Sequence, residues 1–247
     1  MKASHDAQLA LACLDYTRLN EQDGEQDIHA FLAQLSASKP RPAAICVYPQ
    51  WLEYVKKYVD THFNWPVSLA TVTNFPSGAQ PLAQVLSTTQ QAIAQGANEI
   101  DLVLPYKALI NGDEALALSY VQQSKALCAN KAKLKVIIES GELPLDMVAK
   151  ATRIAINGGA DFVKTSTGKV PINATLDAVE VILDEIQQSG EAVGVKVSGG
   201  IKNLAQAQQY LQLCISKMGG AWVTPIHFRF GASSSICGDL AKCREGR

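Results

Sequence analysis

The sequence predicts an α/β protein of the (β/α)8 class, a TIM barrel in which eight parallel strands close on themselves beneath a layer of helices. Three observations lead to this expectation. Short β-rich runs alternate with longer helical patterns throughout the 247 residues. The runs are almost continuously apolar, which is typical of parallel strands covered by helices. Eight strand–helix units of roughly 30 residues each fill a chain of this length.

The β-rich runs follow one another at regular intervals. Seven are clear, at residues 43–49, 67–75, 98–105, 133–140, 161–167, 192–200 and 226–234, and an eighth, weaker run covers 11–17. Helical patterns lie between them; those at 81–96 and 174–190 have apolar residues at three- and four-residue spacing and end in glycine. No linker or shift in composition divides the chain, so we expect a single domain over residues 1–247.

An open, doubly wound sheet is the main alternative to the barrel. That fold usually carries a G-x-G-x-x-G turn after its first strand, and the sequence has none there. Polar residues instead fall repeatedly near the C-terminal ends of the strands, which form the active-site face of a barrel. The barrel is therefore the better prediction.

Charge and composition restrict the class of partner. The formal net charge is -1 and the pI is about 6.4, so we expect neither nucleic acid nor a membrane as partner. A small molecule is favoured, and a homo-oligomer stays open beside a monomer. The apolar run at 9–14 is too short for a signal segment or membrane span, which predicts a cytoplasmic protein. Six cysteines without a C-x-x-C pair predict no metal site, and we expect no cofactor.

Two lysines on consecutive predicted strands are the most informative polar residues. They belong to a set near the strand ends that comprises Asp15, Asp101, Glu139, Lys164 and Lys196. Neighbouring strands lie about 4.8 Å apart, so two inward-pointing ammonium groups would share one small space. Burial and like charge would then lower the pKa of at least one lysine. A neutral lysine can form a Schiff base with a carbonyl substrate, and Asp101 would supply a carboxylate for proton transfer.

Alternatives remain open for these charged residues. A lysine near a strand end can extend into water and cover apolar surface with its stem. The pairing of Lys164 with Lys196, together with Asp101, favours the chemical interpretation over this one. For Glu139 the sequence leaves two possibilities, a salt bridge to a barrel lysine or a contact with substrate.

Three turns rich in glycine and hydroxyl residues follow the last three predicted strands, at 165–169, 198–202 and 231–235. Such turns are often only helix caps, but their grouping beside the lysines favours an anion site for a phosphorylated substrate. The first turn, "TSTGK", is not a P-loop. That motif would require glycine in place of Val163 and a hydroxyl residue in place of Val170.

Five segments carry a resemblance to a known family. "ATVTNFPSG", "EIDLVLPY", "FVKTSTGK", "GVKVSGGIK" and "FRFGASS" occur in this order. With this spacing the chain resembles the deoxyribose-phosphate aldolases from about "LDYTRL" to "GASSS". The resemblance implies a class I aldolase that reversibly cleaves 2-deoxy-D-ribose 5-phosphate into acetaldehyde and D-glyceraldehyde 3-phosphate, without metal or cofactor. Its partners would be a small phosphorylated sugar and short aldehydes.

The resemblance also implies residue roles. Lys164 would form the Schiff base, Lys196 would perturb it, and Asp101 would donate and accept protons. The phosphate and sugar would contact Thr167, Gly168, Lys169, Gly199, Gly200, Gly231, Ser233 and Ser234. Another Schiff-base barrel lyase, such as a transaldolase or keto-acid aldolase, and a non-catalytic phosphosugar-binding barrel are the alternatives. The segment after Ser235 departs from the family, because it has few aliphatic residues for a last helix and lacks a terminal tyrosine.

Overall fold

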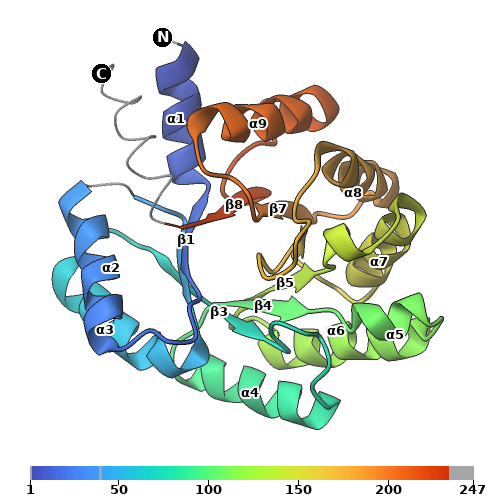
Figure 1. Cartoon of the computed structure of the whole chain (residues 1–247), viewed down its shortest axis with the longest axis horizontal. Coiled ribbons are helices and arrows are strands. Elements are labelled where there is room, and N and C mark those ends of the chain that lie inside the picture. Colours follow the sequence, from blue (N-terminus) through green and yellow to red (C-terminus); the bar gives the residue numbers. More distant parts are fainter. Residues whose placement is uncertain (1, 39–40, 234–247) are drawn as a thin grey trace.

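The computed structural model describes residues 2–38 and 41–233, and its centre is a closed parallel barrel (Figure 1). Each strand pairs in parallel with the next one along the chain, and the last pairs with the first, Leu14 opposite Phe230. The strands are β1 (Leu14–Arg18), β2 (Ala44–Val47), β3 (Ser68–Thr73), β4 (Glu99–Val103), β5 (Lys133–Ile137), β6 (Phe162–Lys164), β7 (Gly194–Ser198) and β8 (Phe228–Ala232). The predicted (β/α)8 fold is confirmed.

Helices surround the barrel and cover the outer faces of its strands (Figure 1). They are α1 (Lys2–Ala12), α2 (Glu25–Ser38), α3 (Leu52–His62), α4 (Leu82–Ala94), α5 (Tyr106–Ile110), α6 (Glu114–Cys128), α7 (Leu145–Asn157), α8 (Leu176–Ser189) and α9 (Leu204–Met218), with 3-10 turns η1 (Pro49–Trp51) and η2 (Ser140–Glu142). None of the helices described is long and apolar enough to cross a membrane.

Strand and helix boundaries differ from the predicted ones in two informative places. The run predicted at 11–17 is a strand only from Leu14, because α1 continues to Ala12 and buries Ala7, Ala10 and Leu11. The run predicted at 161–167 is a strand only at Phe162–Lys164. The residues that follow Lys164 leave the sheet and form a loop over the barrel mouth.

The helix predicted over 174–190 shows how its ends are set. The hydroxyl of Thr175 accepts a hydrogen bond from the backbone N–H of Ala178 at 3.2 Å, which caps the first turn of α8. Gly190 ends the helix in the left-handed conformation, with φ of 68°. Both signals were readable in the sequence, and α8 accordingly spans Leu176–Ser189.

The interior of the barrel is divided into an apolar half and a charged half. On the β2–β3 side, small apolar residues form a separate buried cluster, Ala44, Cys46, Ala70 and Val72. Long charged side chains enter from β4, β5, β6, β7 and β8. Since side chains alternate along a strand, the residues between them, such as Val163 and Val195, face outward into the main core.

Candidate active site

Asp101, Lys164 and Lys196 meet inside the barrel, where the C-terminal ends of β4, β6 and β7 converge. Lys164 and Lys196 lie opposite each other in the β6–β7 register. Asp101 Oδ2 accepts from Lys164 Nζ at 2.8 Å and from Lys196 Nζ at 2.6 Å. All three side chains are at most 3% exposed. The structure thus brings together the three residues that the sequence analysis placed at one end of the barrel.

A larger ion-pair network lies beneath this trio. Lys135 Nζ is 3.0 Å from Asp15 Oδ2, 3.0 Å from Asp101 Oδ1 and 2.5 Å from Glu99 Oε2. Arg229 contacts Asp15 at 2.6 Å and Glu99 at 3.0 Å. Asp15 is one of the residues predicted near the strand ends, whereas Lys135, Glu99 and Arg229 were not predicted. Their signal was the two-residue alternation of a strand, which places Glu99 on the same face as Asp101.

The network, which we call the barrel cluster, carries more positive than negative groups. Its carboxylates are Asp15, Glu99 and Asp101, and its cations are Lys135, Lys164, Lys196 and Arg229. When every member is ionised, the buried cluster therefore holds one uncompensated positive charge. Release of a proton from one lysine balances it.

The pKa shifts indicate which lysine releases that proton. Burial lowers the pKa of Lys164, and the charge of Lys196 lowers it further, while Asp101 opposes both effects. Burial would also lower the pKa of Lys196, but Asp101 and Asp15 outweigh burial and hold that pKa above its ordinary value. The two neighbouring lysines therefore differ, with Lys164 the readier to become neutral.

Asp101 stays ionised in this setting. Burial would raise its pKa, but Lys135, Lys164 and Lys196 together hold the pKa well below its usual range. The carboxylate thus bridges two amines, Lys164 with a lowered pKa and Lys196 with a raised pKa. This arrangement suits transfer of a proton between the amines.

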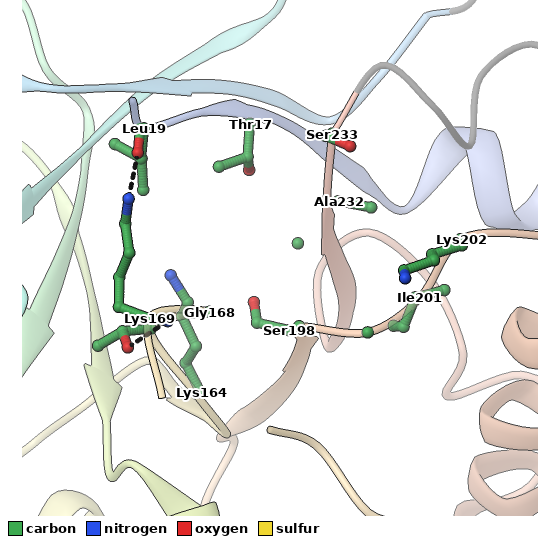
Figure 2. Close-up of a pocket in the computed structure, with 14 residues that line it drawn as sticks. Thr17, Leu19, Lys164, Gly168, Lys169, Ser198, Ile201, Lys202, Ala232 and Ser233 are labelled. Atoms are coloured by element: carbon green, nitrogen blue, oxygen red, sulfur yellow. Dashed lines mark hydrogen bonds between the residues drawn. The ribbon is translucent and has the colours of Figure 1, made fainter. Parts of the chain in front are cut away.

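A cavity of about 520 Å³ opens above Lys164 at the barrel mouth (Figure 2). The amine of Lys164 points into it, whereas Lys196 and Asp101 are not among the residues that line it. Every predicted contact residue that the structure describes lines this cavity, namely Thr167, Gly168, Lys169, Gly199, Gly200, Gly231 and Ser233. The remaining predicted contact, Ser234, lies outside the described residues.

Other residues of the cavity wall were absent from the sequence-based set. They are Thr17, Leu19, Ser198, Ile201, Lys202 and Ala232. Lys202 is the most informative of them, because it adds an exposed ammonium group to the glycine turn after β7. Its signal was the lysine at the end of the "SGGIK" segment, which is absent from the predicted contact residues.

Glu139 is buried, forms no salt bridge with the described residues and does not line the cavity, so the structure shows neither of the two contacts that the sequence left open for it. Its carboxylate accepts from the backbone N–H of Thr167 at 3.0 Å and from the Thr167 hydroxyl at 2.6 Å. The residue is fully buried and has φ of 55°, a left-handed conformation that aims its side chain at the loop after β6. Burial raises its pKa, against the hydrogen bonds from Thr167. Glu139 therefore holds the loop that forms one side of the cavity.

Lys169 reaches across the mouth of the cavity. Its Nζ donates to the backbone carbonyl of Leu19 at 2.7 Å, and its backbone N–H donates to the Thr167 hydroxyl at 3.1 Å (Figure 2). The loop after β6 is thereby joined to the loop after β1. The ammonium group of Lys169 lies at the rim of the cavity. An anion bound in the cavity can replace the Leu19 carbonyl as the hydrogen-bond partner of this ammonium group.

Gly231 faces the site so closely that no side chain fits. A Cβ added there would lie 2.1 Å from Ser198 Oγ and 3.0 Å from Lys196 Cε. We expect Gly231→Ala to lower the free energy of unfolding by about 1–3 kcal/mol, because overpacking displaces buried groups. Urea denaturation measures this difference.

Gly220→Ala is the matched control for that substitution. A Cβ at Gly220 meets nothing within 4 Å, so its effect should stay within about 0.5 kcal/mol. Equal stability of the two variants would contradict the steric conflict that the structure indicates between a side chain at Gly231 on β8 and Ser198 on β7.

Fold and site together define a barrel aldolase, with a buried amine under a cavity at the C-terminal face of a (β/α)8 barrel. The sequence profile of the DeoC/LacD family aldolases matches residues 9–233. The chain belongs to this family.

Solved structures agree in fold. A protein of Toxoplasma gondii ME49, provisionally named a deoxyribose-phosphate aldolase, superposes with a TM-score of 0.90 at 21% identity, over 99% of this chain and 98% of that one. A similarly named protein from Coccidioides immitis gives 0.78 at 25% identity, over 94% and 85%. The tetrameric deoxyribose phosphate aldolase of Aeropyrum pernix gives 0.74 at 20% identity, over 98% and 97%.

Proposed function

We propose that this aldolase reversibly cleaves 2-deoxy-D-ribose 5-phosphate to D-glyceraldehyde 3-phosphate and acetaldehyde through a Schiff base on Lys164, in the catabolism of deoxyribose phosphate. The observation that carries the proposal is a single amine, 3% exposed and with a lowered pKa, that points into the cavity. A neutral amine in a water-poor site is the nucleophile that carbonyl substrates require. The glycine turns around the cavity support a phosphorylated substrate.

The reaction would begin with addition of the Lys164 amine to the C1 aldehyde. Loss of water from the adduct gives an iminium, which can accept the electron pair of the C2–C3 bond. As that bond breaks, the C3 hydroxyl loses its proton and D-glyceraldehyde 3-phosphate leaves. Protonation of the remaining enamine at carbon and hydrolysis then release acetaldehyde and the free amine.

Asp101 and Lys196 would handle the protons of these steps. Asp101 touches both amines and is held ionised, so we assign it transfer between them rather than storage of a proton. Lys196 has a raised pKa and is protonated before each transfer, and its Nζ lies 2.6 Å from both Asp101 and Asp15. It would therefore act as the donor that resupplies a proton after each transfer.

The phosphate would lie among the glycine turns after β6 and β7 and the end of β8. Gly168, Gly199 and Gly200 all have positive φ, which lets their backbone turn N–H groups toward an anion. Lys169 and Lys202 line the same cavity and would add positive charge. Binding at this end fixes the distance from the phosphate to the reacting carbon.

The test of this function has two readouts on the purified protein. Incubation with 2-deoxy-D-ribose 5-phosphate should release acetaldehyde, detected by a coupled alcohol dehydrogenase. Borohydride reduction in the presence of acetaldehyde should leave an N-ethyl group on Lys164, located by peptide mass spectrometry. Absence of acetaldehyde with an adduct present would indicate another Schiff-base reaction, and absence of both would leave a binding protein.

We expect Lys202→Ala to weaken binding of the phosphorylated sugar. Removal of one ammonium beside the phosphate should raise KM about tenfold with little change in kcat. With unphosphorylated 2-deoxyribose KM should hardly change, since the lost charge has no partner there. The control is Lys57→Ala, which removes an exposed lysine of α3 outside the cavity. A loss of the same size with both sugars would contradict the assigned contact.

A further inference from the structure

Ser198, the last residue of β7, has a buried hydroxyl without a hydrogen-bond partner among the residues that the structure describes. The residue is 5% exposed and lines the cavity. In Figure 2 its oxygen is directed into the cavity, into which the amine of Lys164 also points. Buried hydroxyl groups in native proteins are nearly always hydrogen-bonded, so one that faces a binding cavity is a candidate contact for a bound molecule.

The backbone around Ser198 fixes where this hydroxyl lies. Thr165 Oγ1 accepts from the Ser198 backbone N–H at 3.0 Å and donates to the Ser198 carbonyl at 3.2 Å. On the other side, Gly231 lies opposite Ser198 in the β7–β8 register. Because a Cβ at Gly231 would come within 2.1 Å of Ser198 Oγ, the absence of a side chain there leaves the space that the hydroxyl occupies. These contacts and the space beside Gly231 therefore hold the Ser198 hydroxyl in one place at the cavity wall.

Ser198 also stands between the two ends of the proposed substrate. It follows Lys196 by two residues on the inward face of β7 and directly precedes the Gly199–Gly200 turn. A sugar whose C1 is attached to Lys164 and whose phosphate lies at that turn presents its middle carbons to Ser198. Those carbons carry hydroxyl groups.

We propose that Ser198 is a specificity-determining residue, which hydrogen-bonds the substrate hydroxyl on the carbon next to the phosphate-bearing carbon. The inference rests on the proposed function. The C3 hydroxyl loses its proton during cleavage and must lie near the charged amines, whereas the C4 hydroxyl keeps its proton throughout. A serine hydroxyl can both donate and accept, which suits that neutral partner. In the synthetic direction, Ser198 would favour acceptor aldehydes with a 2-hydroxyl group.

The other buried hydroxyls without a partner do not offer this contact. Among the described residues these hydroxyls belong to Tyr48, Thr73, Ser124, Ser140 and Ser166, and none of these residues lines the cavity. Ser124 lies in the helical layer, so it provides a matched control that also removes a buried, unpaired serine hydroxyl.

The test compares two acceptors in the synthetic direction, with acetaldehyde as donor. D-Glyceraldehyde 3-phosphate carries the 2-hydroxyl group, and 3-oxopropyl phosphate is the same acceptor without it. In Ser198→Ala, kcat/KM should fall about tenfold for D-glyceraldehyde 3-phosphate and change little for 3-oxopropyl phosphate. Ser124→Ala should leave the ratio of the two values as in the wild type. Should Ser198→Ala fail to fold, Ser198→Cys, which keeps the volume and weakens the hydrogen bond, replaces it.

The outcomes separate this inference from the function on which it rests. An equal loss on both acceptors would overturn it, because Ser198 would then only support the structure of the site. No loss on either acceptor would overturn it as well. A wild-type protein that uses neither acceptor and forms no N-ethyl adduct would instead overturn the proposed function, and the specificity role with it.

Discussion

Lys164→Ala is expected to abolish turnover, by at least about a thousandfold, and to abolish borohydride trapping of acetaldehyde at every pH. Among the lysines that the structure describes, Lys164 alone joins three properties: it is buried, its pKa is lowered, and it lines the cavity. Lys169 and Lys202 also line the cavity but are exposed, so they keep their hydration. Neither should replace the lost amine.

The fold should survive this substitution. Without Lys164, Asp101 still contacts Lys135 and Lys196, and the barrel cluster has equal numbers of cations and carboxylates. Lys164→Met, which keeps most of the side-chain volume, should therefore unfold near the wild-type temperature while remaining inactive. An adduct mapped to Lys196 in either variant would show that the roles of the two lysines have been assigned the wrong way round.

Lys196→Met is expected to change the pH dependence of borohydride trapping more than it changes the maximal rate of trapping. Loss of this charge removes one cause of the lowered pKa of Lys164 and leaves Asp101 to pair with Lys164 more strongly. The pKa of Lys164 should rise, so a smaller fraction of it is neutral at pH 7. Trapping at neutral pH should slow about tenfold or more and recover as the pH is raised toward 9 to 10.

The extent to which trapping recovers at high pH separates the two causes of the lowered pKa of Lys164, which are burial and the charge of Lys196. Burial is the larger one and persists in the variant, so the profile should not shift as far as that of a free lysine. Rates of reductive trapping across the pH range, measured in parallel for the wild type, give the comparison. An unchanged profile would mean that burial alone tunes Lys164, and no trapping at any pH would mean that Lys196 is itself the nucleophile.

The strand register explains why part of the site could be predicted from sequence. Lys164 and Lys196 interrupt consecutive apolar strands, and parallel neighbours bring such residues together without further information. Predicting the contacts of Glu99 and Arg229 in the same way would have required knowing which strands lie within reach of their side chains. Their partners lie 130 and 214 residues away in sequence, and only closure of the barrel brings them into contact.

Loop geometry was beyond what residue patterns can give. Glu139 accepts from Thr167 because its backbone has a left-handed conformation that glutamate rarely adopts. Similarly, β6 ends at Lys164, directly before the loop whose Thr167 hydrogen-bonds to Glu139. The observed strand boundary therefore differs from the predicted one where a side chain hydrogen-bonds to the loop backbone, whereas the order and number of strands are as predicted.

The excess positive charge of the barrel cluster has a further consequence for carbon–carbon cleavage. Three carboxylates balance the cluster only while Lys164 is neutral. In the proposed reaction the iminium restores the fourth cation, and the barrel cluster itself, as far as the described residues define it, has no fourth carboxylate to pair with it. The charge disappears when the electron pair of the breaking bond moves onto nitrogen and gives a neutral enamine. An unpaired positive charge in the barrel cluster would therefore favour the neutral enamine over the iminium, and in this way would favour bond scission.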